Sequence, residues 1–374
     1  MAKLTIRDIA RLAGVSKSTV SLVLNNRPRV DPETRARVLQ VMEEHNYVPS
    51  VTATALGKGG ASPFIGMIVP GLTWRMVASI NFGVASAVER TNYEIILYTS
   101  TNDRDYRGVV DRVLGTNVVS GMLVVTHDQP VEPLIELQRT GMPVVLLNTL
   151  GAHVDLPSVE SDSYGGARAA VQHLLEFGHR RIACIEGPEH YPCCVDRNKG
   201  YVDALAAAGI TIDADLIRPG GFRPDEAHRQ TVDLLCRPDR PTAIFAHNDP
   251  MAYAVLDAVE ECGLRVPDDV SVVGFDDIVS SAHVRPALTT VRQPFEEMGR
   301  QAAEMLLGAL SYEGGPPRHV RMPTDLAVRD SAGPASRGRR RTVRKRPAVH
   351  GGTGPKLTDA AYASDIENDP PTKQ

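Results

Sequence analysis

From residue 63 onward, short apolar runs alternate with stretches of helical periodicity, and this alternation limits the possible fold more than any other feature. The apolar runs, rich in β-branched residues, lie at 64–69, 94–98, 122–126, 144–147, 182–185, 243–246 and 270–275. The helical patterns lie near 76–91, 104–116, 131–140, 163–177, 197–208, 224–236, 250–262 and 294–310. Continuous apolar strands that alternate with helices predict parallel sheets covered on both faces. About 270 residues of this pattern predict two doubly wound α/β subdomains, with a ligand cleft at the strand ends.

The first fifty residues have a different pattern, that of a small all-α domain. One apolar face predicts a short helix that Thr5 caps and that Gly14 ends. Ser16 is placed to cap a second helix over 17–24, and Asp31 a third helix, with Pro32 at its first position and its end near residue 46. Two short helices joined by a turn with glycine, and a third behind them, predict a helix-turn-helix domain over 1–49.

The net charge of −4 at pH 7 combines segments of opposite sign. Residues 1–60 hold nine basic and five acidic residues, 61–330 hold 23 and 36, and 331–374 hold nine and four. A basic end on an acidic body points to a polyanion partner. The cations expected to face phosphates near the second helix are Lys3, Arg7, Arg11, Arg27, Arg29 and Arg35.

Three motifs carry a resemblance to a known family: TIRDIARLAGVSKSTVSLVLN at 5–25, DPETR at 31–35 and YVP at 47–49. Together they resemble the opening of the lactose/galactose repressor family of bacterial transcriptional regulators. The resemblance implies these DNA-binding residues: Thr5, Lys17, Ser18, Thr19, Ser21, Leu22, Asn25, Arg29, Tyr47 and Leu56. Leu22 departs from the Arg that is common in the family, and leucine cannot hydrogen-bond a base edge, although it can touch a thymine methyl. Ser50 likewise replaces a common Asn.

Residues 50–60 form a linker that is too short for a stable helix alone. The family resemblance implies a hinge helix that orders on DNA and wedges Leu56 into the minor groove. The alternative is a flexible tether with Leu56 merely exposed. Thr52 and Thr54 stand where the family often has Arg or Gln, which weakens the expected polar contacts.

The acidic body also resembles the family, whose fold is shared with periplasmic sugar-binding proteins. The matching motifs are SVESD at 158–162, GHRRIA at 178–183, RNKGYVDAL at 197–205, AIFAHND at 243–249, SVVGFDD at 271–277 and LTTVRQP at 288–294. The resemblance implies an effector-binding and dimerisation domain over 61–330. Its subdomain 1 spans about 61–157 and 289–317, and its subdomain 2 spans about 158–288 and 318–330.

The candidate effector-binding residues in this domain are Thr73, Trp74, Arg75, Asn148, Asp162, Arg197, Phe222, Asn248, Asp276 and Gln293. A sugar is a ring of hydroxyls with one apolar face. Arg197 offers a fork of donors, Asp276 offers acceptors, and Phe222 offers an aromatic surface. The alternative is a purely structural role, in which Asp276 and Asp277 only cap a loop and Arg197 only pairs with a nearby acidic residue.

The segment PGLTWRM at 70–76 departs from the run usual in the family. Trp74 is the only tryptophan, and Arg75 replaces a proline. A cation and a large ring at the lip of the cleft suggest an effector with acidic groups. A lip that packs against the partner subunit explains them equally well.

The remaining sequence features indicate the cellular compartment and whether a metal or cofactor is expected. Five cysteines form no disulfide framework, and Cys193 and Cys194 lack the spacing of a metal or redox motif, so we interpret them as structural. No signal-peptide core or membrane span is present, which favours a cytoplasmic, nucleoid-associated protein. We expect no metal and no cofactor. Residues 331–374, with seven cations in 337–346, are expected to be a disordered basic tail that either adds nonspecific DNA affinity or is merely solvated.

Three functions compete. The first is a homodimeric, ligand-responsive repressor of carbohydrate genes that binds a pseudo-palindromic operator and that a sugar releases. A variant of it uses a nucleobase or protein corepressor, or activates transcription. The second is a sugar-active enzyme using Asp249, Asp276 and Asp277, although no catalytic motif is present. The third is a pure sugar-binding protein, which would have no use for residues 1–56.

Overall fold

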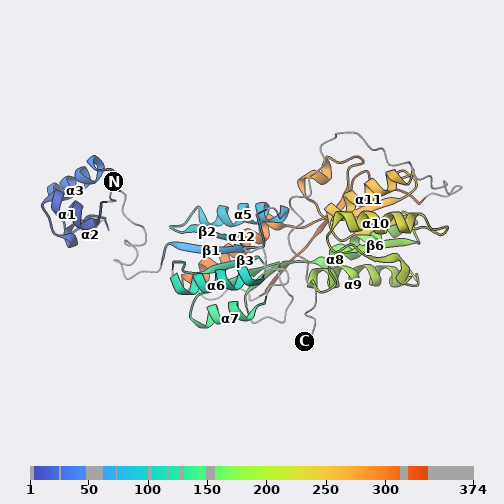
Figure 1. The fold of residues 1–374 in the computed structure, drawn as a ribbon, viewed down its shortest axis with the longest axis horizontal. Helices are drawn as coiled ribbons and strands as arrows, with labels where there is room; N and C mark the ends of the chain where they lie inside the picture. Colours follow the sequence, from blue (N-terminus) through green and yellow to red (C-terminus); the bar gives the residue numbers. More distant parts are fainter. Residues whose placement is uncertain are drawn as a thin grey trace, which may run out of the picture.

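The computed structural model describes residues 4–24, 27–47, 62–72, 74–99, 103–116, 118–125, 130–148, 156–311 and 319–335. Its first unit is three helices: α1 (Ile6–Ala13), α2 (Lys17–Leu24) and α3 (Pro32–Glu44) (Figure 1). Ile9, Val20 and Val38 are fully buried where the three helices meet. The helix-turn-helix fold predicted from the sequence is therefore confirmed, with both short helices at the expected residues.

The body contains two sheets of six strands within the described residues. Sheet A has the order β11-β5-β4-β3-β1-β2, and every pair in it is parallel. Its strands are β1 (Phe64–Val69), β2 (Glu94–Thr99), β3 (Met122–Val125), β4 (Val144–Leu147), β5 (Ser158–Ser161) and β11 (His319–Met322). Helices α5 (Arg75–Val88) and α12 (Phe295–Leu310) cover one face, and α6 (Asp103–Thr116) and α7 (Glu132–Arg139) cover the other (Figure 1).

Sheet B has the order β12-β10-β9-β8-β6-β7, in which only the β10–β12 pair is antiparallel. Its strands are β6 (Ile182–Glu186), β7 (Ile217–Pro219), β8 (Ala243–Ala246), β9 (Ser271–Asp276), β10 (Thr289–Arg292) and β12 (Asp325–Ala327). Helices α8 (Ser163–Glu176) and α9 (Pro192–Ala207) cover one face, and α10 (Pro224–Leu235) and α11 (Asp249–Glu261) the other (Figure 1). Two short 3₁₀ helices, η1 (Ala214–Leu216) and η2 (Val279–Ala282), complete it. The predicted pair of doubly wound subdomains is confirmed.

The chain crosses between the sheets three times, a few residues later than expected. The expected crossings lie at about residues 158, 289 and 318. In the structure β5 pairs with β4 in sheet A, β10 pairs with β9 in sheet B, and β11 pairs with β5 in sheet A. The crossings therefore follow Ser161, Arg292 and Met322, because strand pairing between distant segments, and not local pattern, decides which sheet a short strand joins.

Two further expectations need correction. Helix α9 begins at Pro192 and not at 197, so Cys193 and Cys194 lie in its first turn. Residues 331–335, expected to belong to a disordered tail, pack against sheet B: Ser331 is fully buried, and Gly333 exchanges hydrogen bonds with Ser271. The rest of the expected tail and the linker 50–60 lie outside the described residues.

A pair of glycines lets helices α5 and α12 cross in close contact. A Cβ atom on Gly83 would lie 1.8 Å from the carbonyl oxygen of Glu296, and one on Gly299 would lie 2.1 Å from the carbonyl oxygen of Ile80. Both obstacles are backbone atoms, which cannot rotate away as a side chain can. The crossing therefore holds the middle of α5 and the start of α12 in a fixed relation.

Replacing Gly83 with Ala should force these helices apart and lower the free energy of unfolding by about 1–3 kcal/mol. Gly308→Ala is the matched control, because Gly308 lies on α12 with no atom within 4 Å of its added Cβ. It should be neutral or stabilising by up to about 1 kcal/mol. Urea unfolding of the full chain, followed by circular dichroism, measures both; equal midpoints for the two variants would contradict the close crossing.

Candidate DNA-binding and effector-binding sites

Side chains at the helix ends hold the helix-turn-helix in shape. The Asp8 carboxylate accepts hydrogen bonds from the Thr5 backbone N–H (2.9 Å) and hydroxyl (2.7 Å), which hold the pKa of Asp8 below its ordinary value. Gly14 ends α1 in the left-handed region, at φ 65°. The Asp31 carboxylate caps α3 by accepting from the Thr34 N–H at 2.8 Å. These caps fix where α1 and α3 begin.

Helix α2 presents the residues expected to read bases. The Ser16 hydroxyl caps it by accepting from the Thr19 N–H (3.0 Å), and it also bonds the Ser18 and Thr19 hydroxyls. Lys17 and Ser18 are exposed at the first turn, whereas Ser21 and Leu22 are half-buried. The exposed first turn is the end that a recognition helix places against base edges.

The other candidates of this domain differ in their surroundings. Arg29 is exposed, and Tyr47 packs against the core of the three helices. Arg35, expected to face phosphates, reaches back to α2: its Nη2 donates to the carbonyl oxygen of Arg27 (2.6 Å) and its Nη1 to that of Val23 (3.5 Å). Asn25 and Leu56 lie outside the described residues.

Arg197 lies at the centre of the candidate effector site, on the face of α9 toward sheet B. Its side chain is 4% exposed, its Nη1 donates to the carbonyl oxygen of His247, and its Cζ lies 3.8 Å from the centre of the Phe275 ring. Its Nη2 is 3.9 Å from Asp276 Oδ1. Its buried Nε has no partner among the described residues. Arg197 is thus held rigidly while one buried donor lacks a protein acceptor.

Asp276 and Gln293 connect this arginine to the other sheet. Gln293 Nε2 donates to Asp276 Oδ1 at 2.6 Å, and the Ser161 hydroxyl at the end of β5 donates to Gln293 Oε1. Burial raises the pKa of Asp276 to about 6, and the Arg197 guanidinium opposes that rise. Asp276 is therefore largely ionised at neutral pH, which suits it to accept hydrogen bonds from hydroxyls.

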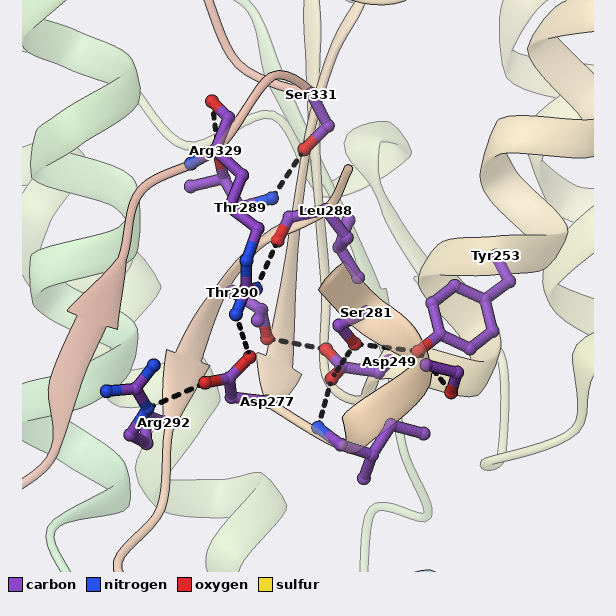
Figure 2. A network of polar contacts seen from close by, with 12 residues as sticks. Asp249, Tyr253, Asp277, Ser281, Leu288, Thr289, Thr290, Arg292, Arg329 and Ser331 are labelled. Carbon is purple, nitrogen blue, oxygen red and sulfur yellow. Dashed lines mark hydrogen bonds and ion pairs between the residues drawn. The ribbon is translucent and has the colours of Figure 1, made fainter. Parts of the chain in front are cut away.

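The two aspartates beside Asp276 are held by protein donors (Figure 2). Asp277 accepts from Arg292 Nε and Arg329 Nη2, each at 2.6 Å. Asp249 is fully buried and accepts from the hydroxyls of Ser281 and Thr290 and from the backbone N–H of residue 278. Burial and the nearby charge of Asp276 raise the pKa of Asp249 to about 8. Both carboxylates thus serve the structure and do not form an exposed acid–base pair.

Two other candidates cap helices with one of their oxygens. Asp162 Oδ1 accepts from the Gly165 N–H at the start of α8, and Asn248 Oδ1 accepts from the Met251 N–H at the start of α11, both at 2.9 Å. Asp162 follows β5 and Asn248 follows β8, so both lie at the carboxyl ends of strands. That edge is where parallel sheets bind ligands.

The aromatic and lip residues surround this edge. Phe222 has a left-handed backbone (φ 59°), and its ring lies edge-on to the ring of Tyr191, 5.9 Å away. Trp74 packs against the core of sheet A, and Arg75 is exposed at the start of α5. Asn148, after β4, is half-buried with its amide 3.9 Å from the Met76 sulfur. Thr73 lies outside the described residues.

A pocket of about 950 Å³ lies between α5, the loop after β9 and the start of α12. Three candidates line it, namely Arg75, Asp276 and Gln293. Ser280 and His283 also line it and were not anticipated from the sequence. The remaining described candidates are not in its wall, so the structure gathers them at the strand ends without enclosing them in this one pocket.

His247 is a further residue that sequence reasoning missed. It is fully buried, its Nδ1 accepts from the Gly187 N–H at 3.1 Å, and its carbonyl oxygen holds Arg197. Burial keeps the pKa of its ring well below the ordinary value, so the ring is neutral. A polar residue directly after the apolar run AIFA was the available signal.

Comparison with known proteins assigns the chain to a family. Residues 5–50 match the model of bacterial regulatory proteins of the lacI family, and residues 171–332 match a periplasmic binding protein-like domain. The repressor PurR of Photobacterium profundum is 34% identical over 333 residues, which cover 87% of this chain and 98% of PurR. The chain belongs to the lacI family.

Solved structures agree with this assignment. The lac repressor dimer bound to operator and the anti-inducer ONPF superposes with a TM-score of 0.78 at 27% identity, covering 89% of this chain and all of the other. The complex of the regulator CelR with cellobiose gives a TM-score of 0.67 at 34% identity, covering 88% and 99%. This lacI-family protein is a ligand-responsive, DNA-binding transcriptional repressor and not an enzyme.

Two negative findings within the described residues concern membranes and metal ions. No helix there is long and apolar enough to cross a bilayer. Within the same residues, no group of three or more His, Cys, Asp or Glu side chains is arranged to hold a metal ion.

The raised pKa of Asp249 predicts a stability effect that depends on pH. Because the folded protein holds this proton up to about pH 8 while the unfolded chain releases it near pH 4, Asp249 removes stability as pH rises between these values. Asp249→Asn removes this titration and can still accept from the N–H of residue 278. Its free energy of unfolding relative to the parent protein should therefore rise from pH 6 to pH 8, by at most about 1.4 kcal/mol per pH unit. Urea unfolding at each pH measures the difference, and a difference that stays constant with pH would contradict the assignment.

Proposed function

We propose that the repressor acts as a homodimer on a pseudo-palindromic operator, with one α2 helix in each of two successive major grooves. The exposed Lys17 and Ser18 at the first turn of α2 support this arrangement. Leu22 replaces a polar reader with an apolar side chain, so the half-site should contain a thymine methyl, and not a guanine edge, at the matching position. Phosphate contacts then fall to exposed cations such as Arg29.

The effector is a sugar or a closely related polyhydroxylated molecule, and it binds between the two sheets. The observation that carries this proposal is the cluster of buried Arg197, half-buried Asp276 and buried Gln293 at the junction of the sheets. This set combines donors and acceptors at fixed positions, as a ring of hydroxyls requires. The similarity to the CelR–cellobiose complex supports the same class of ligand.

The three crossings couple the effector to DNA. Asp162 directly follows β5 and Gln293 directly follows β10, where the first two crossings begin. A ligand bound by both side chains would therefore contact segments that join the subdomains. Such a ligand shifts the relative position of the sheets only if it binds one arrangement more tightly. The arrangement it favours decides whether the hinge segments order on DNA or not.

Selection of operators from random DNA with the full-length protein tests this function directly. The selection is repeated with a panel of neutral sugars, sugar acids and nucleosides. We expect a palindromic site whose enrichment is lost with one sugar, which identifies the operator, the effector and the direction of control. Enrichment gained with a nucleoside would establish the corepressor variant instead. No enrichment under any condition would refute the proposed operator binding.

Leu56→Ala tests the proposed hinge wedge. Loss of the apolar wedge should weaken binding to the selected operator by at least tenfold, because the kinked minor groove loses its inserted side chain. Binding to unrelated DNA depends on phosphate contacts and should be unchanged. Fluorescence anisotropy on both DNAs measures the ratio, with Thr54→Ala as the control variant in the same segment. Equal losses on both DNAs would count against the wedge.

A further inference from the structure

The wall of the described pocket holds polar side chains that the proposed contacts to sugar hydroxyls do not use. Arg75 and Ser79 on α5 line it from one side, and Ser280 in η2 and His283 directly after η2 line it from the other. Arg75, Ser79 and His283 are exposed, and Ser280 is half-buried. A guanidinium, two hydroxyls and an imidazole are all able to donate hydrogen bonds. This part of the wall is therefore rich in donors.

The charge of Arg75 acts across the pocket on the other subdomain. Burial raises the pKa of Tyr253 on α11, and the positive charge of Arg75 opposes that rise. The Tyr253 and Ser280 hydroxyls are hydrogen-bonded to each other at 2.9 Å. Helix α5 covers sheet A, whereas α11 and η2 belong to the subdomain of sheet B. A group bound by Arg75 would therefore lie between the two subdomains.

Most of the other charged side chains in the pocket wall are already paired with protein groups. The pairs are Asp277 with Arg292 at 2.6 Å, Glu297 with Arg300 at 2.8 Å, and Asp276 with Gln293 at 2.6 Å and Arg197 at 3.9 Å. Asp277 also accepts from Arg329 at 2.6 Å. Two charged residues of the wall remain, namely Arg75 and Glu296.

The helices explain Glu296 but not Arg75. Glu296 lies in the first turn of α12, where negative charge is favourable. Arg75 is the first residue of α5, where positive charge opposes the helix dipole. Its guanidinium makes no hydrogen bond or ion pair within the part of the chain that the structure describes. Arg75 is thus a cation in the pocket wall without a protein anion, and its position does not help the helix.

We infer that Arg75 binds an anionic group of the effector, which is therefore a sugar acid or a sugar phosphate and not a neutral sugar. The inference rests on the proposed effector site, because the hydroxyls of the same molecule would bind at Arg197, Asp276 and Gln293. A carboxylate and a phosphate share the chemistry required here, since the guanidinium donates two parallel hydrogen bonds to either group. The pocket of about 950 Å³ has room for both parts of such a molecule.

Trp74 offers a direct measurement, because it is the only tryptophan and immediately precedes Arg75. Its fluorescence in the full-length protein is titrated with three matched pairs of ligands: glucuronate and glucose, galacturonate and galactose, and ribose phosphate and ribose. Calorimetry on the same pairs supplies the affinities if the fluorescence does not change. The charged member of at least one pair should bind at least about tenfold more tightly than its neutral parent, since charge-assisted hydrogen bonds are the stronger ones. The uronates and the phosphate distinguish the two kinds of anion.

Three variants test whether Arg75 is the residue that holds the anion. Arg75→Gln should reduce the preference for the charged ligand to less than about threefold, because the charge assistance is lost. Arg90→Gln removes the same charge from an exposed arginine just beyond the other end of α5 and should keep the preference. Glu296→Gln removes negative charge from the pocket wall and should increase it. Equal losses in Arg75→Gln and Arg90→Gln would overturn the inference, because overall charge would then be the cause.

Salt provides a further check on the ion pair. Raising sodium chloride from about 0.05 to 0.5 M should weaken binding of the charged ligand and leave binding of its neutral parent unchanged, because Arg75 is exposed and salt screens its charge. The same loss for both ligands would contradict a contact through Arg75.

The outcomes separate this inference from the function on which it rests. Binding of neutral sugars with no tighter binding of their charged partners would overturn the inference and leave the proposed effector site standing. A preference for the charged ligand that persists in Arg75→Gln would place the anion elsewhere and overturn the assignment of Arg75. If no member of the panel binds, the proposed sugar site falls together with the inference, whereas operator binding is judged by the selection from random DNA.

Discussion

The junction of the two sheets depends on the ion pairs of Asp277 at the end of β9. This carboxylate, 7% exposed, holds Arg292 on β10 and Arg329 after β12 (Figure 2). Arg292 ends β10, directly before a crossing, and Arg329 follows β12, so one carboxylate ties together the ends of two neighbouring strands of sheet B. Arg329 is 19% exposed and Arg292 58%, so the pair with Arg329 is the better shielded from water and the pair with Arg292 is screened by solvent. The hinge geometry therefore rests on a group that need not touch the effector.

One residue before Asp277, the same end of β9 carries Asp276, the carboxylate proposed to contact the effector. Asp276 has a positive φ of 120° and Asp277 one of 52°, so the backbone turns sharply and directs two neighbouring carboxylates to different partners. Asp277 holds the crossings, whereas Asp276 is shared between Gln293 and Arg197. The glycine-mediated contact of α5 with α12 sets the opposite wall of the pocket. A ligand at Asp276 would thus be adjacent to the start of α5, the end of β10 and the start of α12.

Local signals predicted the helices of the DNA-binding domain almost to the residue. Asp8 accepts from the N–H of Thr5, and Ser16 and Asp31 each accept from an N–H three residues later, so no distant contact is needed to define the ends. The long apolar strands of both sheets were equally predictable, because burial on both faces leaves a continuous apolar run. Of the candidate effector residues, three line the described pocket, because the resemblance carried positions but not the shape of the cleft.

The misplaced features depend on contacts between distant residues. Strand β11 joins sheet A by pairing with β5, far away in the sequence, whereas β5 and β10 pair with the strands β4 and β9 that precede them. No local pattern marks which sheet each of these short strands joins. Helix α9 starts early because Pro192 is compatible with a first helical turn, although that turn has no apolar periodicity. Gly333 packs because the buried side chains of His179 and Ser271 bond its carbonyl oxygen, and Ser331 packs because its hydroxyl donates to the carbonyl oxygen of Val272.

The structure shows which basic residues of this unevenly charged chain serve the fold. Arg35, one of the nine basic residues in the first sixty, holds the end of α2 and is not placed for phosphate contact alone. In the body, Arg197, Arg292 and Arg329 are committed to carboxylates at one junction. Cations paired with carboxylates add little net attraction for DNA, and the net negative charge of the body repels it. In the proposed DNA complex, the excess of negative charge on the body therefore favours contact through the exposed cations around α2, which is the orientation that reading a base sequence requires.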